Sequence, residues 1–364
     1  MKVIISGGGS GGHIFPAIAI ANAIRAKYAD SDILFIGANK RMEMEKVPLA
    51  GYKIEGLPIS GLQRRLTWKN ILFPFKVVLS LIKAKRIIKK FNPDIAIGVG
   101  GYASAPTLKQ ASKLNIPTII QEQNSYPGIT NKILSKKANK ICVAYDNMER
   151  WFEKDKICFT GNPVRQNVID IKGKETKAYN FFKLEENKTT ILAIGGSLGA
   201  LTINQSIDEG LKYFVDNNIQ LIWQTGKNYY NKAKESISNI NSDNIKVFEF
   251  IYDMDLAYSA ADIIISRAGA MAISELSLIG KPTILIPSPN VAEDHQTKNA
   301  TALVNKDAAI MVKDVDAREN LITTLNDLIN DKNKQKTLSD NIVKLGIKDA
   351  DSRIVEIVEE LILK

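Results

Sequence analysis

Two glycine-rich loops are the segments best suited to binding a ligand. Each loop follows a short apolar run directly and precedes a helix-like run. The run 3–5 leads into 7–12, which holds five glycines and is followed by His13. The run 190–194 leads into 195–200, again rich in glycine. Glycine removes the Cβ atoms that would keep an anion away from the backbone, and N–H groups at a helix start bind phosphate. The pattern predicts two phosphate-binding loops at equivalent places in two halves of the chain.

The first loop also matches the dinucleotide fingerprint Gly7-x-Gly9-x-x-Gly12, so a nicotinamide or flavin enzyme is an alternative. Such enzymes place an acidic residue at the end of the second strand to hold the ribose. Here that strand, 33–36, ends in Gly37-Ala38-Asn39, which carries no acid. This absence counts against NAD.

Polar residues follow two further strand-like runs. Gly98–Tyr102 is a third glycine cluster, and Glu122 and Asn124 follow the next run. Carboxylate and amide groups at strand ends suit sugar hydroxyls or a departing diphosphate, although loop polarity alone explains many such clusters. His13 is one of only two histidines, with His295, and its place beside the first loop makes it a candidate acid, base or hydrogen-bond donor.

In the second half, the run 262–266 leads into a helix-like run whose first amides suit an anion. Glu275, one turn into that run, suits a ribose diol, or it merely favours the helix N-terminus. Asp253-Met254-Asp255 resembles the DxD metal motif found in sugar-nucleotide enzymes. Because it opens a helix, N-capping is the preferred interpretation.

The net charge of +10 is concentrated in the first half. Residues 1–160 hold 25 Lys and Arg against 11 Asp and Glu, whereas residues 161–364 hold 24 against 28. This asymmetry predicts that one half faces a polyanion or an anionic membrane surface. No recognition motif or aromatic platform accompanies the charge, so nucleic acid is not expected.

The segment 69–91 mixes large apolar residues with seven cations. A helix that covers a sheet needs one apolar stripe, and this explains most of the segment. The surplus apolar residues with their flanking lysines predict a surface that lies on anionic lipid. That membrane patch comprises Phe73, Phe75, Lys76, Leu79 and Lys83, and Lys132, Lys136, Lys137 and Lys140 are expected to extend it.

Both halves alternate short Val/Ile/Leu runs with helical stretches, which is typical of parallel sheets with ligands at the carboxyl ends of the strands. We expect strands in the first half near 2–6, 32–37, 52–57, 94–98, 117–121, 140–144 and 157–160. In the second half we expect them near 189–194, 219–224, 245–249, 262–265, 282–286 and 308–311. The turn at Gly161-Asn162-Pro163 divides an N-terminal domain, 1–162, from a C-terminal domain, 163–349. A helix at 350–364, capped by Asp351-Ser352-Arg353, is expected to pack on the first domain.

The bulk composition is that of a globular protein of two domains: 364 residues, of which 45% are hydrophobic. We expect neither a signal peptide nor a membrane-spanning helix, and the cytoplasm is the default compartment. The two cysteines, Cys142 and Cys158, are expected to be buried free thiols rather than a disulfide or metal ligands.

The motifs together resemble the MurG family of peptidoglycan glycosyltransferases along nearly the whole chain. The resemblance rests on the segments 8–16, 98–102, 122–124, 161–165, 195–200 and 294–300. It implies an α/β GT-B fold, in which two doubly wound Rossmann-like domains face a cleft. It also implies inverting transfer of N-acetylglucosamine from UDP-N-acetylglucosamine to the 4-hydroxyl of undecaprenyl-diphosphate-linked N-acetylmuramyl-pentapeptide, with no cofactor and no obligatory bound metal.

The resemblance also assigns roles to single residues. It implies that Ser10, Gly11, Gly12 and Asn124 line the sugar and diphosphate region, and that Arg165 and Ser197 approach the donor phosphates. Ile251 holds the uracil through its backbone, with Met254 beside it. The nucleotide is bracketed by Ala270, Met271, Ala272, Ile273, Ser274 and Glu275, with Glu275 on the ribose. Gln296 and Asn299 reach the sugar hydroxyls. The base that assists the acceptor hydroxyl is either His13 or Glu122.

By this resemblance the enzyme is peripheral, on the cytoplasmic face of the cell membrane, and serves cell wall biogenesis, cell shape and cell division. An enzyme of the UDP-N-acetylglucosamine 2-epimerase kind has the same architecture and is the main alternative. It needs no lipid-facing patch. A lipid-binding protein without enzymatic activity would leave the loop at 195–200 unexplained.

Overall fold

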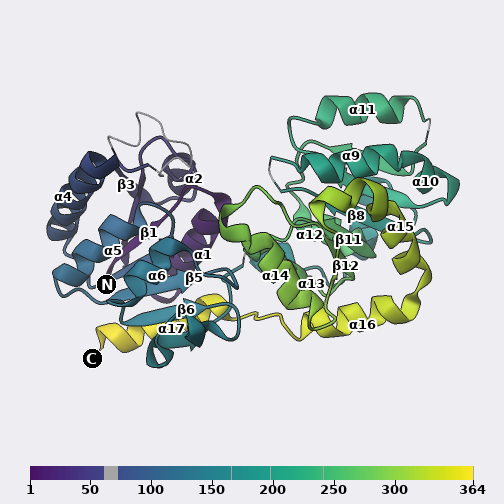
Figure 1. Ribbon diagram of the computed structural model, residues 1–364. Coiled ribbons are helices and arrows are strands. Elements are labelled where there is room, and N and C mark those ends of the chain that lie inside the picture. Colours follow the sequence, from purple (N-terminus) through teal and green to yellow (C-terminus); the bar gives the residue numbers. More distant parts are fainter. Residues whose placement is uncertain (61–72, 165, 197, 241, 364) are drawn as a thin grey trace. The chain divides into compact units, whose positions relative to one another are not determined.

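The computed structural model describes residues 1–60, 73–164, 166–196, 198–240 and 242–363 (Figure 1). It consists of two compact units, each built from a parallel sheet and helices. Unit 1 comprises Met1–Val164 and Ile347–Lys364, and unit 2 comprises Arg165–Gly346. The chain therefore leaves unit 1 two residues beyond the expected boundary at 162 and returns to it near its end.

Unit 1 holds a seven-stranded sheet in the order β3-β2-β1-β4-β5-β6-β7, in which every neighbouring pair is parallel. Val, Ile and Leu dominate the strands because both faces of the sheet are covered. All seven strands lie within two residues of the predicted ranges, and the predicted doubly wound α/β class is confirmed. Their bounds are β1 Lys2–Gly7, β2 Asp32–Ala38, β3 Lys53–Leu57, β4 Ile95–Gly100, β5 Thr118–Glu122, β6 Lys140–Val143 and β7 Ile157–Phe159.

The helices of unit 1 cover both faces of its sheet. Val3 and Ile5 pack with Ile14 of α1, whereas Ile4 on the opposite face packs with Ala84 of α4. The helices are α1 Gly11–Lys27, α2 Glu43–Leu49, α4 Phe73–Phe91, α5 Ser104–Lys113, α6 Ile129–Ser135 and α17 Ala350–Ile362, with 3-10 turns η1 Met148–Arg150 and η2 Lys154–Lys156.

The C-terminal helix α17 packs against α1 and completes the core of unit 1. Ile354 and Val358 are fully buried there, and Glu359 accepts a hydrogen bond from the Tyr28 hydroxyl and forms an ion pair with Lys27. The predicted cap at Asp351 is wrong. Asp349 occupies the N-cap position, and its side chain makes no capping bond.

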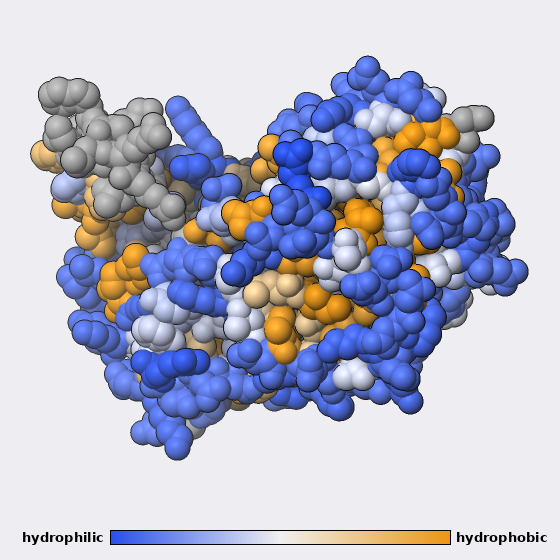
Figure 2. All heavy atoms as spheres, turned by 45° about the vertical axis from the view of Figure 1, so that its right-hand side comes forward, coloured by the Kyte–Doolittle hydropathy of each residue, from blue (hydrophilic) through white to orange (hydrophobic). Residues whose placement is uncertain are grey.

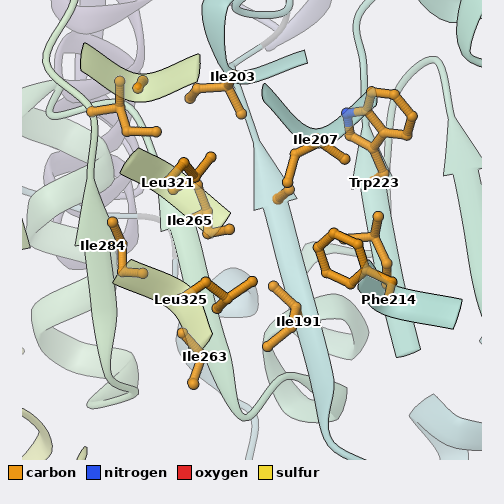
Figure 3. Packing of buried hydrophobic residues seen from close by; sticks show 14 of the residues in the cluster. Ile191, Ile203, Ile207, Phe214, Trp223, Ile263, Ile265, Ile284, Leu321 and Leu325 are labelled. Atoms are coloured by element: carbon orange, nitrogen blue, oxygen red, sulfur yellow. The ribbon is translucent and has the colours of Figure 1, made fainter. Parts of the chain in front are cut away.

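Unit 2 holds a six-stranded parallel sheet in the order β10-β9-β8-β11-β12-β13. Figure 3 shows part of its core, where Ile191, Trp223 and Ile265 of the sheet pack with Ile207 and Leu321 of two helices. The strands are β8 Thr190–Ile194, β9 Gln220–Gln224, β10 Ile245–Phe248, β11 Ile263–Ser266, β12 Thr283–Leu285 and β13 Ile310–Met311.

The helices of unit 2 alternate with its strands. They are α7 Gln166–Ile169, α8 Glu175–Phe182, α9 Leu201–Glu209, α10 Leu211–Asp216, α11 Tyr230–Ser238, α12 Met254–Ala260, α13 Ala270–Ile279, α14 His295–Val304, α15 Ala317–Asn330 and α16 Lys332–Val343. Short turns η3 Ala292–Asp294 and η4 Asp314–Asp316 flank α14 and α15.

Both cysteines are free thiols and lie side by side in register on β6 and β7. Cys142 is buried, as predicted, and burial raises the pKa of its thiol, whereas Cys158 is only half-buried. In the part of the chain that the structure describes, no helix is both long and apolar enough to span a membrane.

Candidate active site

In each sheet the strand order reverses direction beside the strand that carries the glycine loop. β1 lies between β2 and β4, and β8 lies between β9 and β11. Crevices for ligands form at the carboxyl ends of strands at such a switch point. The two glycine loops therefore each stand at the ligand-binding edge of their own unit.

In unit 1, the loop after β1 touches the loop after β4 so closely that only glycine fits. A Cβ at Gly101 would overlap the carbonyl of Gly8, and Gly101 has a φ of +84°, which side chains other than glycine rarely adopt. Sequence reasoning had placed both clusters at the strand ends, and the structure brings them together.

Glu43, at the start of α2, braces the first loop from beneath. Its carboxylate accepts hydrogen bonds from the backbone N–H of Gly9 at 2.9 Å and of Ala38 at 3.0 Å, and its residue is 1% exposed. It packs against Gly8 and Gly37, where added Cβ atoms would overlap its side chain. Sequence reasoning missed Glu43 because it lies outside every glycine motif. The only available signal was an acidic residue shortly after the second strand.

Ser10, Gly11 and Gly12 form the start of α1. Ser10 is extended and its hydroxyl makes no capping bond, while its carbonyl accepts from the N–H groups of His13 and Ile14. The first N–H groups of an α-helix lack acceptors within the helix and carry its positive end. This edge of unit 1 is therefore suited to an anion.

His13 is the third residue of α1 and lies against Gly100, the last residue of β4. Its Nδ1 is 2.9 Å from Oε1 of Gln123, which follows β5. A Cβ on Gly100 would come within 2.8 Å of the imidazole, so glycine makes room for the ring. Three separate strand ends thus place this histidine.

Glu122 is buried, with 1% of its surface exposed, and its carboxylate accepts four hydrogen bonds. Oε1 accepts from the backbone and the side-chain amide of Asn124, and Oε2 accepts from Gly128 N–H and the Asn131 side chain. Four donors satisfy the charge of a buried carboxylate and fix the loop 122–131. This geometry favours a structural role for Glu122 over that of base.

In unit 2, the loop after β8 is held by β9. Gly199, with a φ of +76°, lies against the Thr225 carbonyl, which a Cβ would overlap. The Gln224 side chain donates to the Gly196 carbonyl at 3.1 Å and accepts from Ile251 N–H at 2.9 Å. The Ile251 N–H is therefore engaged within unit 2. Sequence reasoning assigned no role to Gln224. Arg165 and Ser197 lie outside the described residues.

Helix α13 begins at Ala270, after Gly269 at its N-cap position. Ala270 and Ile273 are buried, and Met271, Ala272 and Ser274 are half-buried. Glu275 lies in the second turn and accepts from the Tyr258 hydroxyl at 3.3 Å, so the alternative that it serves the helix N-terminus is wrong. Arg267, which precedes the helix, is committed to Asp314 and to the carbonyl of Ile286.

Two residues of α14 were predicted to contact a sugar. Gln296 is half-buried and accepts from Ser288 N–H at 2.9 Å. Asn299 is fully buried and its amide donates to the Ala268 carbonyl at 3.4 Å, which links α14 to the start of α13. Just before α14, Glu293 and Asp294 both have left-handed φ angles, of 56° and 51°. Such backbone strain in residues other than glycine is concentrated at functional sites.

The two acids of the DxD-like segment lie at the start of α12. Asp253 occupies the N-cap position of α12, yet its side chain makes no capping bond. Burial raises the pKa of Asp255. The 2.9 Å hydrogen bond from Lys174 and the positive charge of that lysine lower the pKa by more, so the pKa of Asp255 lies below its usual range. Among the residues described, no group of three or more His, Cys, Asp or Glu side chains is arranged to bind a metal.

Comparison with known families gives two matches that together span most of the chain. Residues 3–143 match the glycosyltransferase family 28 N-terminal domain, and residues 190–354 match the family 28 C-terminal domain.

Curated relatives match end to end. UDP-N-acetylglucosamine--N-acetylmuramyl-(pentapeptide) pyrophosphoryl-undecaprenol N-acetylglucosamine transferase from Cytophaga hutchinsonii is 56% identical over 99% of this chain and 97% of its own length. The protein of the same name from Flavobacterium psychrophilum is 54% identical over 99% and 98%.

Among solved structures, Acinetobacter baumannii MurG has a TM-score of 0.80 at 25% identity and covers 99% of each chain. Solved UDP-N-acetylglucosamine 2-epimerases also share the fold, at 14% to 18% identity with TM-scores of 0.66 to 0.69. At that identity the likeness to the epimerases concerns the fold alone.

The role of Glu43 as a brace predicts a stability loss. Glu43→Gln removes one acceptor from a buried backbone N–H, and leaving such a group unsatisfied costs about 1–3 kcal/mol. Amide exchange at Gly9 and Ala38 should quicken accordingly, measured by hydrogen–deuterium exchange. The matched control is Glu45→Gln on the exposed side of the same helix, expected within about 0.5 kcal/mol of the unsubstituted chain. Equal effects of the two substitutions would refute the assignment.

Proposed function

The chain belongs to glycosyltransferase family 28, and from this membership we infer that it transfers N-acetylglucosamine from UDP-N-acetylglucosamine to undecaprenyl-diphosphate-linked N-acetylmuramyl-pentapeptide. The end-to-end identity of 56% to a transferase of that name carries this conclusion. The product is the disaccharide lipid intermediate of peptidoglycan synthesis. A 2-epimerase has only the fold in its favour.

The reaction joins the acceptor 4-hydroxyl to the anomeric carbon of the donor sugar. As the new C–O bond forms, the bond from that carbon to the diphosphate breaks and its electron pair leaves with UDP. The hydroxyl proton must go to a base, and charge developing on the diphosphate must be stabilised. His13 is assigned as the base, because Glu122 already accepts four hydrogen bonds.

We assign the donor to unit 2. The N–H groups of the loop 195–200 and the first turn of α13 suit the UDP phosphates, and Arg165 and Ser197 are assigned to the same phosphates. Glu275 is assigned to the ribose and the backbone of Ile251, with Met254 beside it, to the uracil. For Gln296 and Asn299 a sugar contact stays a prediction, since their amides bond to the backbone at Ser288 and Ala268.

We assign the acceptor to unit 1. The N–H groups at Ser10, Gly11 and Gly12 suit the lipid-linked diphosphate, and Asn124 lies at the neighbouring strand end. These are the positions from which the acceptor hydroxyl would be presented to His13.

The membrane-facing surface is assigned to α4 and its neighbours. The helix buries Ser80, Ala84, Ile87 and Ile88 toward the sheet, as a stripe at helical spacing. A second apolar stripe is exposed on its other side, comprising Phe75 at 67%, Val78 at 55%, Leu79 at 56% and Ile82 at 53%. One stripe suffices to cover a sheet, so the second supports contact with lipid. Figure 2 shows hydrophobic residues at the surface among hydrophilic ones on the face that it presents.

Two lysines of the predicted patch make hydrogen bonds within unit 1, and their contact with lipid stays a prediction. Lys76 donates to the Ser60 hydroxyl at 3.2 Å and Lys83 to the Gly56 carbonyl at 2.8 Å, and Phe73 is half-buried. Between α5 and α6, Lys109, Lys113, Lys136 and Lys137 line a largely apolar cavity of about 210 Å³, and Ile133 at its edge is exposed.

From these surfaces and the acceptor's lipid anchor we place the enzyme as a peripheral protein on the cytoplasmic face of the cell membrane. Its reaction serves cell wall biogenesis, and through it cell shape, the cell cycle and cell division.

The transfer itself is tested with labelled UDP-N-acetylglucosamine and the lipid-linked muramyl-pentapeptide. We expect the label in the lipid fraction and UDP in equal amount. The same mixture without the lipid acceptor should release no free sugar. Appearance of N-acetylmannosamine without label in the lipid would identify an epimerase and contradict the proposal.

The membrane assignment predicts that Phe75→Glu with Leu79→Glu weakens binding to vesicles of phosphatidylglycerol and phosphatidylcholine. Each substitution removes an apolar contact worth about 1.5–3 kcal/mol and adds repulsion, so partitioning should fall at least tenfold in a sedimentation assay. Leu49→Glu, at a leucine of α2 that is 74% exposed, is the control and should bind as the unsubstituted chain does. Unchanged partitioning of the double variant would disprove the assignment.

A further inference from the structure

The orientation of one buried amide determines which nitrogen of His13 carries a hydrogen. Gln123 is 1% exposed, and its Oε1 is 2.9 Å from His13 Nδ1. An amide oxygen can only accept, so the order of oxygen and nitrogen in this side chain decides the direction of the bond.

The contacts of the Gln123 nitrogen, Nε2, determine which atom of the amide faces His13. Nε2 of Gln123 donates to the carbonyl oxygens of Val99 at 2.9 Å and Gln121 at 3.1 Å, and it also contacts the Gln121 side-chain oxygen. Carbonyl oxygens accept and never donate. A flipped Gln123 would point its oxygen at these acceptors and its amino group at His13. The observed arrangement therefore makes Oε1 the acceptor and His13 Nδ1–H the donor.

A closed network prevents the amide from turning. The Gln121 side chain donates to Asn162 Oδ1 at 2.8 Å, and Asn162 Nδ2 donates to the backbone carbonyl of Gln123 at 3.0 Å. All three side chains are buried. Each amide donor in this network has an acceptor. Rotation of any one of the three amides would therefore break at least two buried hydrogen bonds.

We propose that Gln123 is a positioning residue that holds neutral His13 in the tautomer with hydrogen on Nδ1 and the lone pair on Nε2. This inference rests on the proposed function, in which His13 takes the acceptor proton. The hydroxyl proton passes to Nε2, the oxygen bonds to the anomeric carbon, and the electron pair of the broken bond leaves on UDP. The imidazolium so formed keeps its Nδ1–H bond to Oε1.

A neutral amide suits this task. A carboxylate at the same place would stabilise the imidazolium strongly and hinder return of the proton, whereas an amide fixes the tautomer and the ring with less effect on basicity. Gly100 completes the arrangement, because its missing Cβ leaves space for the ring on the other side.

The test uses the fact that the chain has only two histidines. NMR of isotope-labelled histidine, at a pH where the rings are neutral, reports the hydrogen on each ring nitrogen, and His295→Gln assigns the signals. We expect His13 to carry its hydrogen on Nδ1. Gln123→Met, of similar volume, should move it toward the Nε2–H form and lower kcat about 10- to 100-fold, with little change in KM for UDP-N-acetylglucosamine.

Two further variants make the result decisive. Gln123→Glu, with its carboxyl protonated on the oxygen that faces the Val99 carbonyl, keeps an acceptor oxygen toward Nδ1 and should retain the Nδ1–H tautomer. This variant also serves if the methionine variant does not fold. Gln110→Met, at a buried glutamine of α5 outside the network, should change neither the tautomer nor kcat.

An Nε2–H tautomer in the unsubstituted chain, or an Nδ1–H tautomer that survives Gln123→Met, would overturn the proposal. A tautomer shift with unchanged kcat would also overturn it, since His13 would then not act as the base. Failure of the proposed function is read separately, as absence of label transfer by the unsubstituted chain.

Discussion

The burial of two carboxylates without a cation is the constraint on which the candidate site of unit 1 depends. Among the described residues, Glu43 and Glu122 form no ion pair, and each is almost completely buried. A buried charge persists only if donors surround it, and here backbone and amide N–H groups do so. Glu43 thereby fixes the loop after β1, and Glu122 fixes the loop after β5. His13 stands between these loops, bonded to Gln123, so its position depends on both.

In unit 2 the glycine loop is held by a neutral side chain instead of a carboxylate. Gln224 bonds at one end to the glycine loop after β8 and at the other to Ile251, so one amide sets the spacing of the two segments assigned to the phosphates and the base. In unit 1 the corresponding bond to the glycine loop is made by the buried carboxylate of Glu43, which also accepts from Ala38 N–H.

The fold could be predicted because Val/Ile-rich runs between helical stretches specify buried parallel strands, and glycine clusters mark where a sheet meets its ligand. All of the expected strands are present within two residues. The supports of the site could not be predicted, since a buried acid such as Glu43 carries no local motif and its partners lie five and 34 residues away. The same holds for Asn299, whose burial depends on the packing of α14 rather than on its own sequence neighbours. Helix ends were also hard to predict. Residue type suggested caps at Asp253 and Asp351, but neither side chain makes a capping hydrogen bond at the start of its helix.

The central claim is that proton transfer belongs to unit 1 and donor binding to unit 2. His13→Ala separates the two when kcat and the donor affinity are measured on the same preparation, the affinity by calorimetry with UDP-N-acetylglucosamine. Our account predicts that kcat falls about 100-fold or more, the range of general base catalysis, while the donor Kd changes less than about twofold. An unchanged kcat, or a loss explained entirely by weaker donor binding, would contradict it.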